Sequence, residues 1–217
     1  MKISVLTHAN EPFKPVSNLT IPVFQEYCHR YHYNFLCKTE HTSGRHIVWE
    51  KIALILDQFE NNRENFDWLC YCDADVMIMN HTIKLETFID DSKDFIGTND
   101  CHGYNAGVFF LKNSDWSFDF MKKVWGVNPH NPTLRGRYND TQAEQLSIVH
   151  AMNEEPNKDA HVKIVQQSLF NSFPYHHWHI HYPEGEFKEG DFIVHLPGMN
   201  TQERVDYFNK YKELIIR

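Results

Sequence analysis

The sequence predicts an α/β fold: an α/β/α sandwich in which helices cover both faces of a mainly parallel central sheet. Short apolar runs typical of buried strands, such as residues 68–72 and 192–195, alternate with segments whose apolar residues follow helical spacing. This alternation is typical of the strand–helix units that build a parallel sheet. One such sheet suits a chain of 217 residues, so we expect a single domain over residues 1–217.

The first half of the chain predicts strands at residues 3–6, 34–38, 68–72, 76–79 and 95–97, helices at 17–33 and 48–60, and a polar loop at 7–10. The second helix is indicated by helical spacing of apolar residues between Trp49 and Phe59. Ser17 or Asn18 is expected to cap the first helix. Pro15 is expected to keep the preceding segment irregular.

The second half predicts strands at residues 107–112, 162–165 and 192–195, helices at 115–125, 141–153 and 201–215, and loops at 126–139 and 170–190. Both loops are rich in residues that interrupt regular structure. Ligands of open α/β sheets bind at the carboxyl ends of the strands, so side chains that follow the strands are the candidate site residues.

Net charge excludes one class of partner. The chain carries a formal charge of −8 and contains no cluster of Lys and Arg, whereas a nucleic-acid-binding domain presents a basic patch. An acidic protein can bind a diphosphate when a cation screens the charges. We therefore expect no nucleic-acid partner and look for carboxylates that could hold a metal.

Cysteine usage and hydropathy predict a soluble, cytoplasmic protein or a domain of a longer one. The five cysteines are odd in number and lack the spacing of a disulfide framework, and Cys70 and Cys72 lie in an apolar run typical of buried strand thiols. The N-terminus does not resemble a signal peptide, and no apolar stretch approaches the about 20 residues that a membrane span needs.

Asp73 and Asp75 are the strongest candidate metal ligands. They follow the apolar run at 68–72, where the carboxyl end of a strand is expected, and residues two apart on a strand share a face. Placing two like charges together is costly unless a cation joins them. Mg²⁺ or Mn²⁺ prefers oxygen ligands and keeps coordination positions for substrate phosphates. A solvated turn is the alternative interpretation.

Two further segments could contribute to a site. His195 ends the last predicted strand, where it could be a core residue or supply a third metal ligand, and imidazole suits Mn²⁺ better than Mg²⁺. Small residues at 103–107 lead into the strand that follows, where they allow the backbone to approach a ligand closely or form a bulge.

The segment at 141–145 and a helical lysine are ambiguous. Thr141 and Glu144 match a capping box, so Glu144 is interpreted as a helix cap and Gln145 as the more available polar group. Lys51 could reach a diphosphate or simply be solvated. Residues 173–182 are rich in His and aromatic side chains, which stack on sugar rings and bind hydroxyls, so they are interpreted as a wall for the acceptor or donor sugar.

Several motifs are missing: the sequence has no Walker A loop, no dinucleotide-binding glycine motif and no nucleophile elbow. The motifs that are present, in their order, resemble the GT-A glycosyltransferases of the galactosyl/xylosyltransferase group, glycosyltransferase family 34. The motifs are Trp-Glu-Lys at 49–51, Asp-Ala-Asp at 73–75, Asn-Ala-Gly-Val-Phe at 105–109, Glu-Gln at 144–145 and His-Leu-Pro-Gly at 195–198.

This resemblance implies a GT-A fold, a nucleoside-diphosphate sugar donor with UDP as the nucleotide, Mn²⁺ (or Mg²⁺), a glycan or glycoprotein acceptor and retention of anomeric configuration. Residues 1–100 would form mainly the nucleotide-binding half and residues 101–217 mainly the half that binds donor sugar and acceptor. The site residues carried over by the match are Asp73, Asp75 and His195 for the metal; Thr7, His8, Lys51, Asp73, Ala74, Ala106, Gly107 and Gly198 for the nucleotide sugar; and Asn105, Glu144 and Gln145 for catalysis.

We expect no membrane anchor of the kind that family members carry, and the sequence departs from the family pattern at two places: Glu144 stands where an Asp is usual, and the turn after His195 lacks a cysteine. Such compact relatives without an anchor suit a bacterium or a large DNA virus. In the expected reaction, an acceptor hydroxyl attacks the anomeric carbon on the front face of an ion pair, because no residue is a clear covalent nucleophile.

Two alternatives stay open from sequence. A nucleotidyl- or sugar-phosphate-transferring enzyme could use the same carboxylates on a similar fold, although residues 7–10 offer no basic triphosphate loop. A non-catalytic carbohydrate-binding protein could hold a structural cation at the same place.

Overall fold

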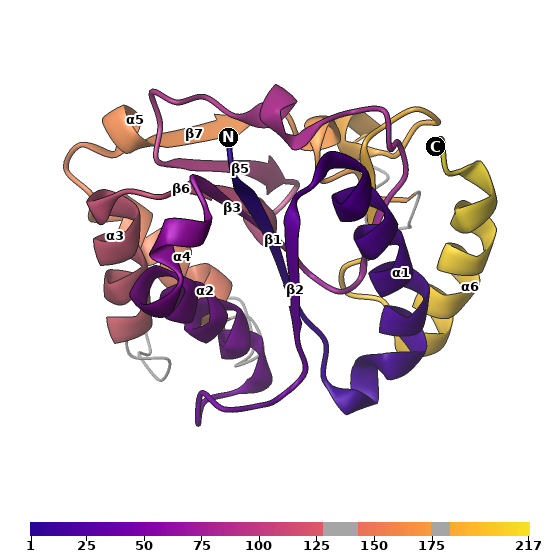
Figure 1. Ribbon diagram of the computed structural model, residues 1–217, viewed down its shortest axis with the longest axis horizontal. Coiled ribbons are helices and arrows are strands. Elements are labelled where there is room, and N and C mark those ends of the chain that lie inside the picture. The colour runs from indigo at the N-terminus through magenta and orange to yellow at the C-terminus, as the bar shows by residue number, and fades with distance from the viewer. Residues whose placement is uncertain (128–142, 175–182) are drawn as a thin grey trace.

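The computed structural model describes residues 1–127, 143–174 and 183–217. Within them, the main sheet has six strands in the order β2-β1-β3-β6-β5-β7 (Figure 1). Their bounds are β1 Ile3–His8, β2 Asn34–Lys38, β3 Trp68–Cys72, β5 Phe95–Asp100, β6 Gly103–Lys112 and β7 Val162–Val165. A second, two-stranded sheet pairs β4 Val76–Ile78 with β8 Ile193–His195.

The central sheet is mainly parallel, as predicted. β1 pairs in parallel with β2 and β3, and β5 pairs in parallel with β7. β6 is inserted between β3 and β5 and runs antiparallel to both. β6 runs antiparallel to β5 because the two strands form a hairpin. At its turn Asp100 and Gly103 are directly paired, and Gly103 has a φ of 110°. That conformation is accessible to glycine at little cost.

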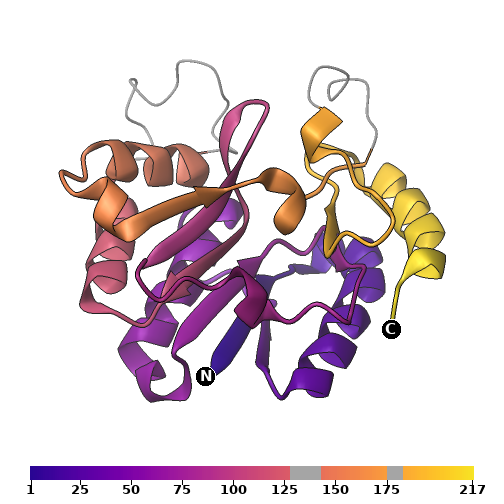
Figure 2. The same ribbon diagram turned by 90° about the horizontal axis from the view of Figure 1, so that it is seen from above.

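Helices cover both faces of the sheet, which confirms the sandwich. α1 Lys14–Tyr31 and α6 Thr201–Tyr211 pack together on one face, and α2 Glu50–Asn61, α3 Asp115–Gly126 and α4 Ala143–Asn153 cover the other. Figure 2 shows the same two layers from above, with α6 beside α1 at the end of the chain. The short helix α5 Lys158–His161 precedes β7. The described 3₁₀ helices are Glu11–Phe13, Ile47–Trp49, Arg63–Asn65, Leu85–Phe88, Gln167–Leu169, Pro183–Gly185 and Lys212–Leu214.

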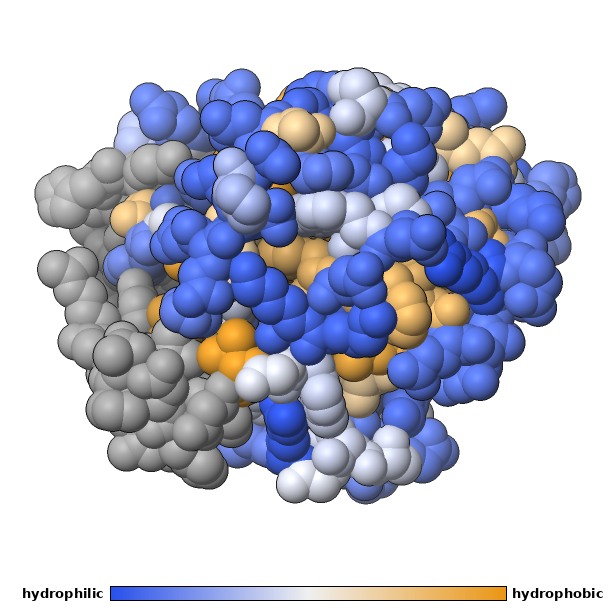
Figure 3. All heavy atoms as spheres, turned by 90° about the vertical axis from the view of Figure 1, so that its left-hand side faces the viewer, coloured by the Kyte–Doolittle hydropathy of each residue, from blue (hydrophilic) through white to orange (hydrophobic). Residues whose placement is uncertain are grey.

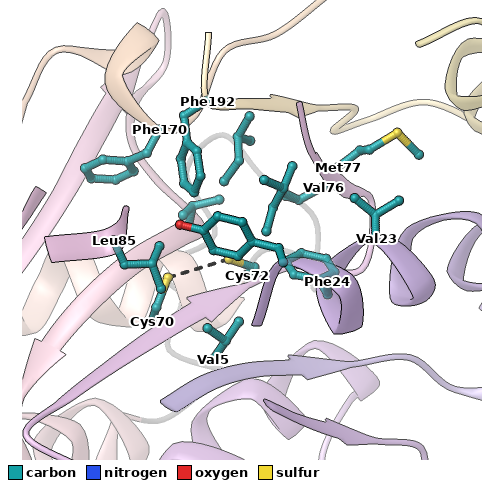
Figure 4. Close-up of a cluster of buried hydrophobic side chains, with 14 of the residues drawn as sticks. Val5, Val23, Phe24, Cys70, Cys72, Val76, Met77, Leu85, Phe170 and Phe192 are labelled. Carbon is teal, nitrogen blue, oxygen red and sulfur yellow. Dashed lines mark hydrogen bonds between the residues drawn. The ribbon is translucent and has the colours of Figure 1, made fainter. Parts of the chain in front are cut away.

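Two apolar cores lie on the two faces of the sheet because alternate strand residues point to opposite sides. Figure 4 shows the core under α1, which includes Phe24 from the helix, Val5 from β1 and Phe192 from the loop before β8. Cys70 and Cys72 belong to this core, their sulfur atoms 3.7 Å apart, and both are free thiols. The prediction of buried strand thiols is therefore confirmed.

Three predicted boundaries were wrong. Thr7 and His8 extend β1 instead of forming a loop, and residues 103–106 already belong to β6. α1 begins at Lys14 and its N-cap is Phe13, so neither Ser17 nor Asn18 caps it. Pro15 does not interrupt this helix, because a proline in the first turn removes no intrahelical hydrogen bond.

The closing helix is also shorter than predicted, since α6 ends at Tyr211 and a 3₁₀ turn follows.

Figure 3 shows that the outer face of the layer containing α3 is mainly hydrophilic, with apolar side chains visible in separate patches. None of the helices in the described part of the chain combines the length and apolar character that crossing a bilayer requires.

Candidate active site

Asp73 and Asp75 lie in a turn between β3 and β4. β3 ends at Cys72, and the turn is fixed by backbone hydrogen bonds from Asp73 N to Gly107 O (2.7 Å) and from Val76 N to Asp73 O (3.2 Å). Asp73 and Asp75 therefore do not lie on a strand. The prediction that they point the same way because they share the face of a strand was wrong. The turn at the carboxyl end of β3 brings them together instead.

The pairing of β4 with β8 supplies the third potential ligand. Val76 is directly opposite His195 in this small antiparallel sheet, so the imidazole lies beside the turn that holds the two carboxylates. Potential ligand atoms of Asp73, Asp75 and His195 all lie within 4.8 Å of one another. Two carboxylates and an imidazole fit Mn²⁺ chemically, because that ion accepts both oxygen and nitrogen ligands.

Gly107 makes room for His195. A Cβ atom built on Gly107 would lie 2.2 Å from Cε1 and 2.8 Å from Nδ1 of the His195 ring. The edge-to-face contact with Phe173, whose ring centroid is 5.3 Å away, limits the ring from another direction. The small residue predicted to allow close approach of a ligand thus allows close approach of a side chain of the same protein.

Lys51 is buried between two carboxylates. Its Nζ lies 3.1 Å from Asp73, 3.4 Å from Glu144 and 2.8 Å from the carbonyl oxygen of Ala106. The lysine side chain is 5% exposed, so the interpretation as a solvated residue was wrong. Burial lowers the pKa of Lys51, but the two neighbouring carboxylates raise it more, and the net pKa lies above its ordinary value.

Glu144 faces this lysine from α4. Its side chain is 7% exposed, and burial raises the pKa of its carboxyl despite the opposing effect of Lys51. Oε2 of Glu144 has no hydrogen-bond partner among the described residues. Thr141, the other half of the predicted capping box, lies outside the described residues. Gln145 is the more exposed of the pair, as predicted, and its Oε1 accepts a hydrogen bond from Ala106 N at 2.9 Å.

Arg204 pairs with the second carboxylate of the turn. Its Nε and NH2 groups lie 3.0 and 2.9 Å from Oδ2 of Asp75, and Nε also donates to the carbonyl of Leu196. Burial raises the pKa of Asp75, while His195 and Arg204 lower it more, so the net pKa is below its ordinary value. Lys51 and Arg204 therefore each offset one of the carboxylates that a cation would join.

These residues line one cleft with two adjoining cavities. The larger has a volume of about 590 Å³ and includes Asp73, Asp75, Asp100, Asn105, Gly107, Glu144, Gln145, His195, Gly198 and Arg204 among its lining residues. The smaller, of about 220 Å³, shares Lys51, Asp73, Asp75 and Glu144 with it and adds His8, Ala74 and Tyr71. A cleft of this size at the carboxyl ends of β1 and β3 is where a ligand of an α/β sheet is expected.

The remaining predicted residues take different positions. His8 lines the smaller cavity and lies 3.2 Å from the carbonyl of Glu40, and burial lowers its pKa. Thr7 is fully buried, and its hydroxyl has no hydrogen-bond partner among the described residues. Gly198 adopts a φ of 71° in the turn after β8, which favours glycine. Their contacts with a nucleotide sugar stay predictions.

The predicted aromatic wall is only partly described. Phe173 packs on His195, whereas residues 175–182 lie outside the described residues.

Two residues near the site, Arg204 and Asn171, were not predicted from the sequence. Arg204 looked like one more charged residue of an exposed helix. Asn171 belongs to no motif recognised in the sequence, yet its Oδ1 lies 2.8 Å from His195 Nδ1.

Known proteins resemble this chain in sequence and in fold. A model of the galactosyl transferase GMA12/MNN10 family matches residues 89–206, more than half of the chain. An alpha-1,2-galactosyltransferase of Schizosaccharomyces pombe is 24% identical over 95% of this chain. The probable alpha-1,6-mannosyltransferase MNN10 of Saccharomyces cerevisiae is 23% identical over 90% of it. The chain spans 63% and 58% of the lengths of these two relatives.

Solved structures share the fold. A glycosyltransferase involved in the glycosylation of the major capsid of PBCV-1 superposes with a TM-score of 0.73 at 17% identity, over 97% of this chain and 100% of that one. The galactosyltransferase LgtC, solved with donor and acceptor sugar analogs, gives a TM-score of 0.62 at 11% identity over 97% of this chain and 94% of its own. With its GT-A fold and the match over residues 89–206, this chain belongs to the galactosyl transferase GMA12/MNN10 family of glycosyltransferases.

Proposed function

We propose that this chain transfers a sugar from a nucleoside-diphosphate sugar, with UDP as the nucleotide, to a hydroxyl group of a glycan, with retention of anomeric configuration. One observation carries the proposal: Asp73, Asp75 and His195 place potential ligand atoms within 4.8 Å of one another at the edge of the cleft. Galactosyl and mannosyl groups in the names of the relatives favour a hexose as the transferred sugar.

The three residues would hold Mn²⁺ or Mg²⁺. When bound, the cation supplies Lewis-acid stabilisation of the charge on the departing diphosphate. The residues of the chain set up the rest of this environment. His195 and Asp75 are buried, while Asp73 is 31% exposed and so faces the side from which a phosphate can approach.

Lys51 and Arg204 would add fixed positive charge beside the diphosphate. Both line the larger cavity, and both are already held in place by carboxylates and backbone carbonyls, so little reorganisation is needed when negative charge develops on the leaving group. Because each cation also offsets a carboxylate of the turn, the site tolerates its acidic pair before a ligand binds.

Glu144 and Gln145 would contact the donor sugar. The unpartnered Oε2 of Glu144 is a buried acceptor in a residue that lines both cavities, and a sugar hydroxyl could satisfy it. Because the carboxylate of Glu144 is paired with Lys51, we expect Glu144 to bind the sugar and not to attack the anomeric carbon. The acceptor hydroxyl then attacks on the face that the nucleotide leaves, which retains configuration.

Residues 1–100 would bind mainly the nucleotide and residues 101–217 mainly the sugar and the acceptor. His8 and Ala74 at the smaller cavity support the first part of this division, and Asn105 and Gly198 at the larger cavity support the second. Thr7, which precedes His8 at the end of β1, would lie beside the nucleotide.

Hydrolysis of the donor in the absence of an acceptor tests the proposal. The protein is incubated with Mn²⁺ and a set of UDP-linked hexoses and pentoses and GDP-linked mannose, and the released nucleoside diphosphate is measured. We expect slow release of UDP from one or a few of these donors, and none from Asp75→Ala.

The alternatives predict other products. A nucleotidyltransferase would form pyrophosphate from UTP and a sugar phosphate, and a carbohydrate-binding protein would release no nucleotide from any donor. Either result, or full activity of folded Asp75→Ala, would contradict the proposal.

A further inference from the structure

Asn171 links the candidate metal ligand His195 to a buried network of amides. It follows the 3₁₀ helix Gln167–Leu169 and is fully buried. Its Oδ1 lies 2.8 Å from Nδ1 of His195, and its Nδ2 lies 2.8 Å from Thr98 Oγ1 and 3.0 Å from Asn105 Oδ1. Both the oxygen and the nitrogen of the Asn171 amide therefore have hydrogen-bond partners.

The orientation of the neighbouring amide, Asn105, is fixed by groups that have a single hydrogen-bonding role. The backbone N–H of Gly107 can only donate, and it lies 2.9 Å from Asn105 Oδ1. On the other side, Asn105 Nδ2 donates to Oδ2 of Asp100 at 2.9 Å. Exchanging the oxygen and nitrogen of Asn105 would place two donors together at Gly107 and two acceptors together at Asp100.

The same reasoning fixes Asn171. Because Oδ1 of Asn105 is an acceptor, the group of Asn171 that lies 3.0 Å from it must be the donating NH₂. The oxygen of Asn171 consequently faces His195. An amide oxygen only accepts, so Nδ1 of His195 must carry the proton of that hydrogen bond.

Protonation at Nδ1 leaves the lone pair of the neutral imidazole on Nε2. That atom lies 3.4 Å from Oδ1 of Asp75, so a lone pair and a carboxylate oxygen face each other across the position where a cation would bind. A metal-binding histidine is commonly oriented through a hydrogen bond from its other ring nitrogen.

We propose that Asn171 is a positioning residue that fixes the Nδ1–H tautomer of His195 and thereby prepares Nε2 as a metal ligand. The proposal rests on the proposed function in taking His195 as a ligand of the divalent cation. Asn171 does not touch that site itself. It acts through the imidazole, while Gly107 and Phe173 restrict the plane of the ring.

The first test compares a variant that removes the side-chain amide of Asn171 with a variant that removes only one of its hydrogen-bond partners. Asn171→Leu removes the acceptor that faces His195 and, with it, the hydrogen bonds to Thr98 and Asn105. Thr98→Val is the matched control, because Thr98 is equally buried and bonds the same amide but does not determine which way it points. Binding of Mn²⁺ alone is measured by the electron paramagnetic resonance signal of the free ion, and folding by circular dichroism.

We expect Asn171→Leu to bind Mn²⁺ about 10- to 100-fold more weakly than the wild type, the usual effect of removing a residue that orients a metal ligand. Thr98→Val should stay within about threefold of the wild type by the same reasoning. Wild-type affinity in folded Asn171→Leu would overturn the proposal, as would an equal loss in both variants.

The second test observes the wild type and needs no variant of Asn171. Long-range ¹H–¹⁵N spectra of the metal-free wild type, at an alkaline pH where imidazole is neutral, report which ring nitrogen of His195 is protonated. The signals are assigned by comparison with His195→Gln. We expect the proton on Nδ1, and a predominant Nε2–H form would overturn the proposal. If the wild type binds no Mn²⁺, the metal site of the proposed function fails, whereas this spectrum still accepts or rejects the orienting role of Asn171.

Discussion

Gly107 and His195 are in contact so close that the glycine has no room for a side chain: a Cβ atom would lie 2.2 Å from Cε1 of the imidazole. Gly107 belongs to β6 of the main sheet, whereas His195 ends β8 of the small sheet. The contact therefore sets the position of a candidate metal ligand from one sheet against the backbone of the other.

Replacing this glycine should disturb the metal site more than the fold. In Gly107→Ala the added methyl must push His195 away, and overpacking of this kind costs typically about 1–3 kcal/mol of stability. Because the displaced imidazole no longer faces Asp75, we expect Mn²⁺ affinity to fall at least about tenfold. Calorimetric titration of Mn²⁺ and thermal unfolding measure the two effects.

Gly126→Ala is the matched control, since a Cβ atom there meets nothing within 4 Å. That variant should keep wild-type affinity for Mn²⁺. Unchanged Mn²⁺ affinity in Gly107→Ala would show that the position of His195 does not determine metal binding.

Lys51 should be needed for stability because it is a buried cation between two carboxylates. Lys51→Met leaves Glu144 buried without its counter-charge, and breaking a buried pair in this way costs about 3–5 kcal/mol. Adding Glu144→Gln removes the uncompensated charge and should recover part of the loss. Chemical denaturation of the three proteins measures the free energies of unfolding.

Lys14→Met serves as the comparison for an exposed ion pair, because Lys14 and Glu11 are 58% and 82% exposed. Its effect should be within about 1 kcal/mol. A Lys51→Met variant as stable as Lys14→Met would contradict the account of a buried, charged lysine.

Glu144 should make stability fall as the pH rises. Burial raises the pKa of this carboxyl above its ordinary value of 4.5, so the folded protein binds more protons here than the unfolded chain. The stabilisation from the protonated group is fully present below about pH 4.5 and is lost as the pH rises through the higher pKa of the folded state.

In Glu144→Gln this contribution is absent. The free energy of unfolding of the variant, relative to that of the wild type, should therefore increase as the pH is raised above 4.5. Urea denaturation in the presence of a chelator measures the difference at each pH, with the exposed Glu184→Gln as the control for loss of one charge. A difference that is constant or decreases with pH would contradict the raised pKa.

Local patterns in the sequence were sufficient for the fold and for part of the site. The apolar run at 68–72 and the acidic pair after it are contiguous, so the strand and the position of Asp73 and Asp75 could be predicted, although the turn that orients them could not. The boundary at β1 was missed because polar side chains at Thr7 and His8 suggested a loop, while the strand continues by pairing with β2.

The parts of the site that sequence did not predict depend on long-range packing. Asp75 and Arg204 are 129 residues apart in the chain and are joined by α6 packing beside the turn. Asn171 comes from a segment without regular spacing, and only its contacts with Asn105 and His195 give it a role. The burial of Lys51 likewise follows from the approach of α4, not from the pattern of its own helix.

Titration calorimetry of UDP in the presence and absence of Mn²⁺ tests the central claim most directly, when the wild type is compared with Asp75→Asn and both are shown to be folded by circular dichroism. We predict that the wild type binds Mn²⁺ at a single site and binds UDP more tightly with the ion than without it, and that Asp75→Asn loses this dependence. A wild type that binds neither Mn²⁺ nor UDP, or an Asp75→Asn variant that keeps the full effect of the ion, would contradict a metal-assisted nucleotide-sugar site at the end of β3.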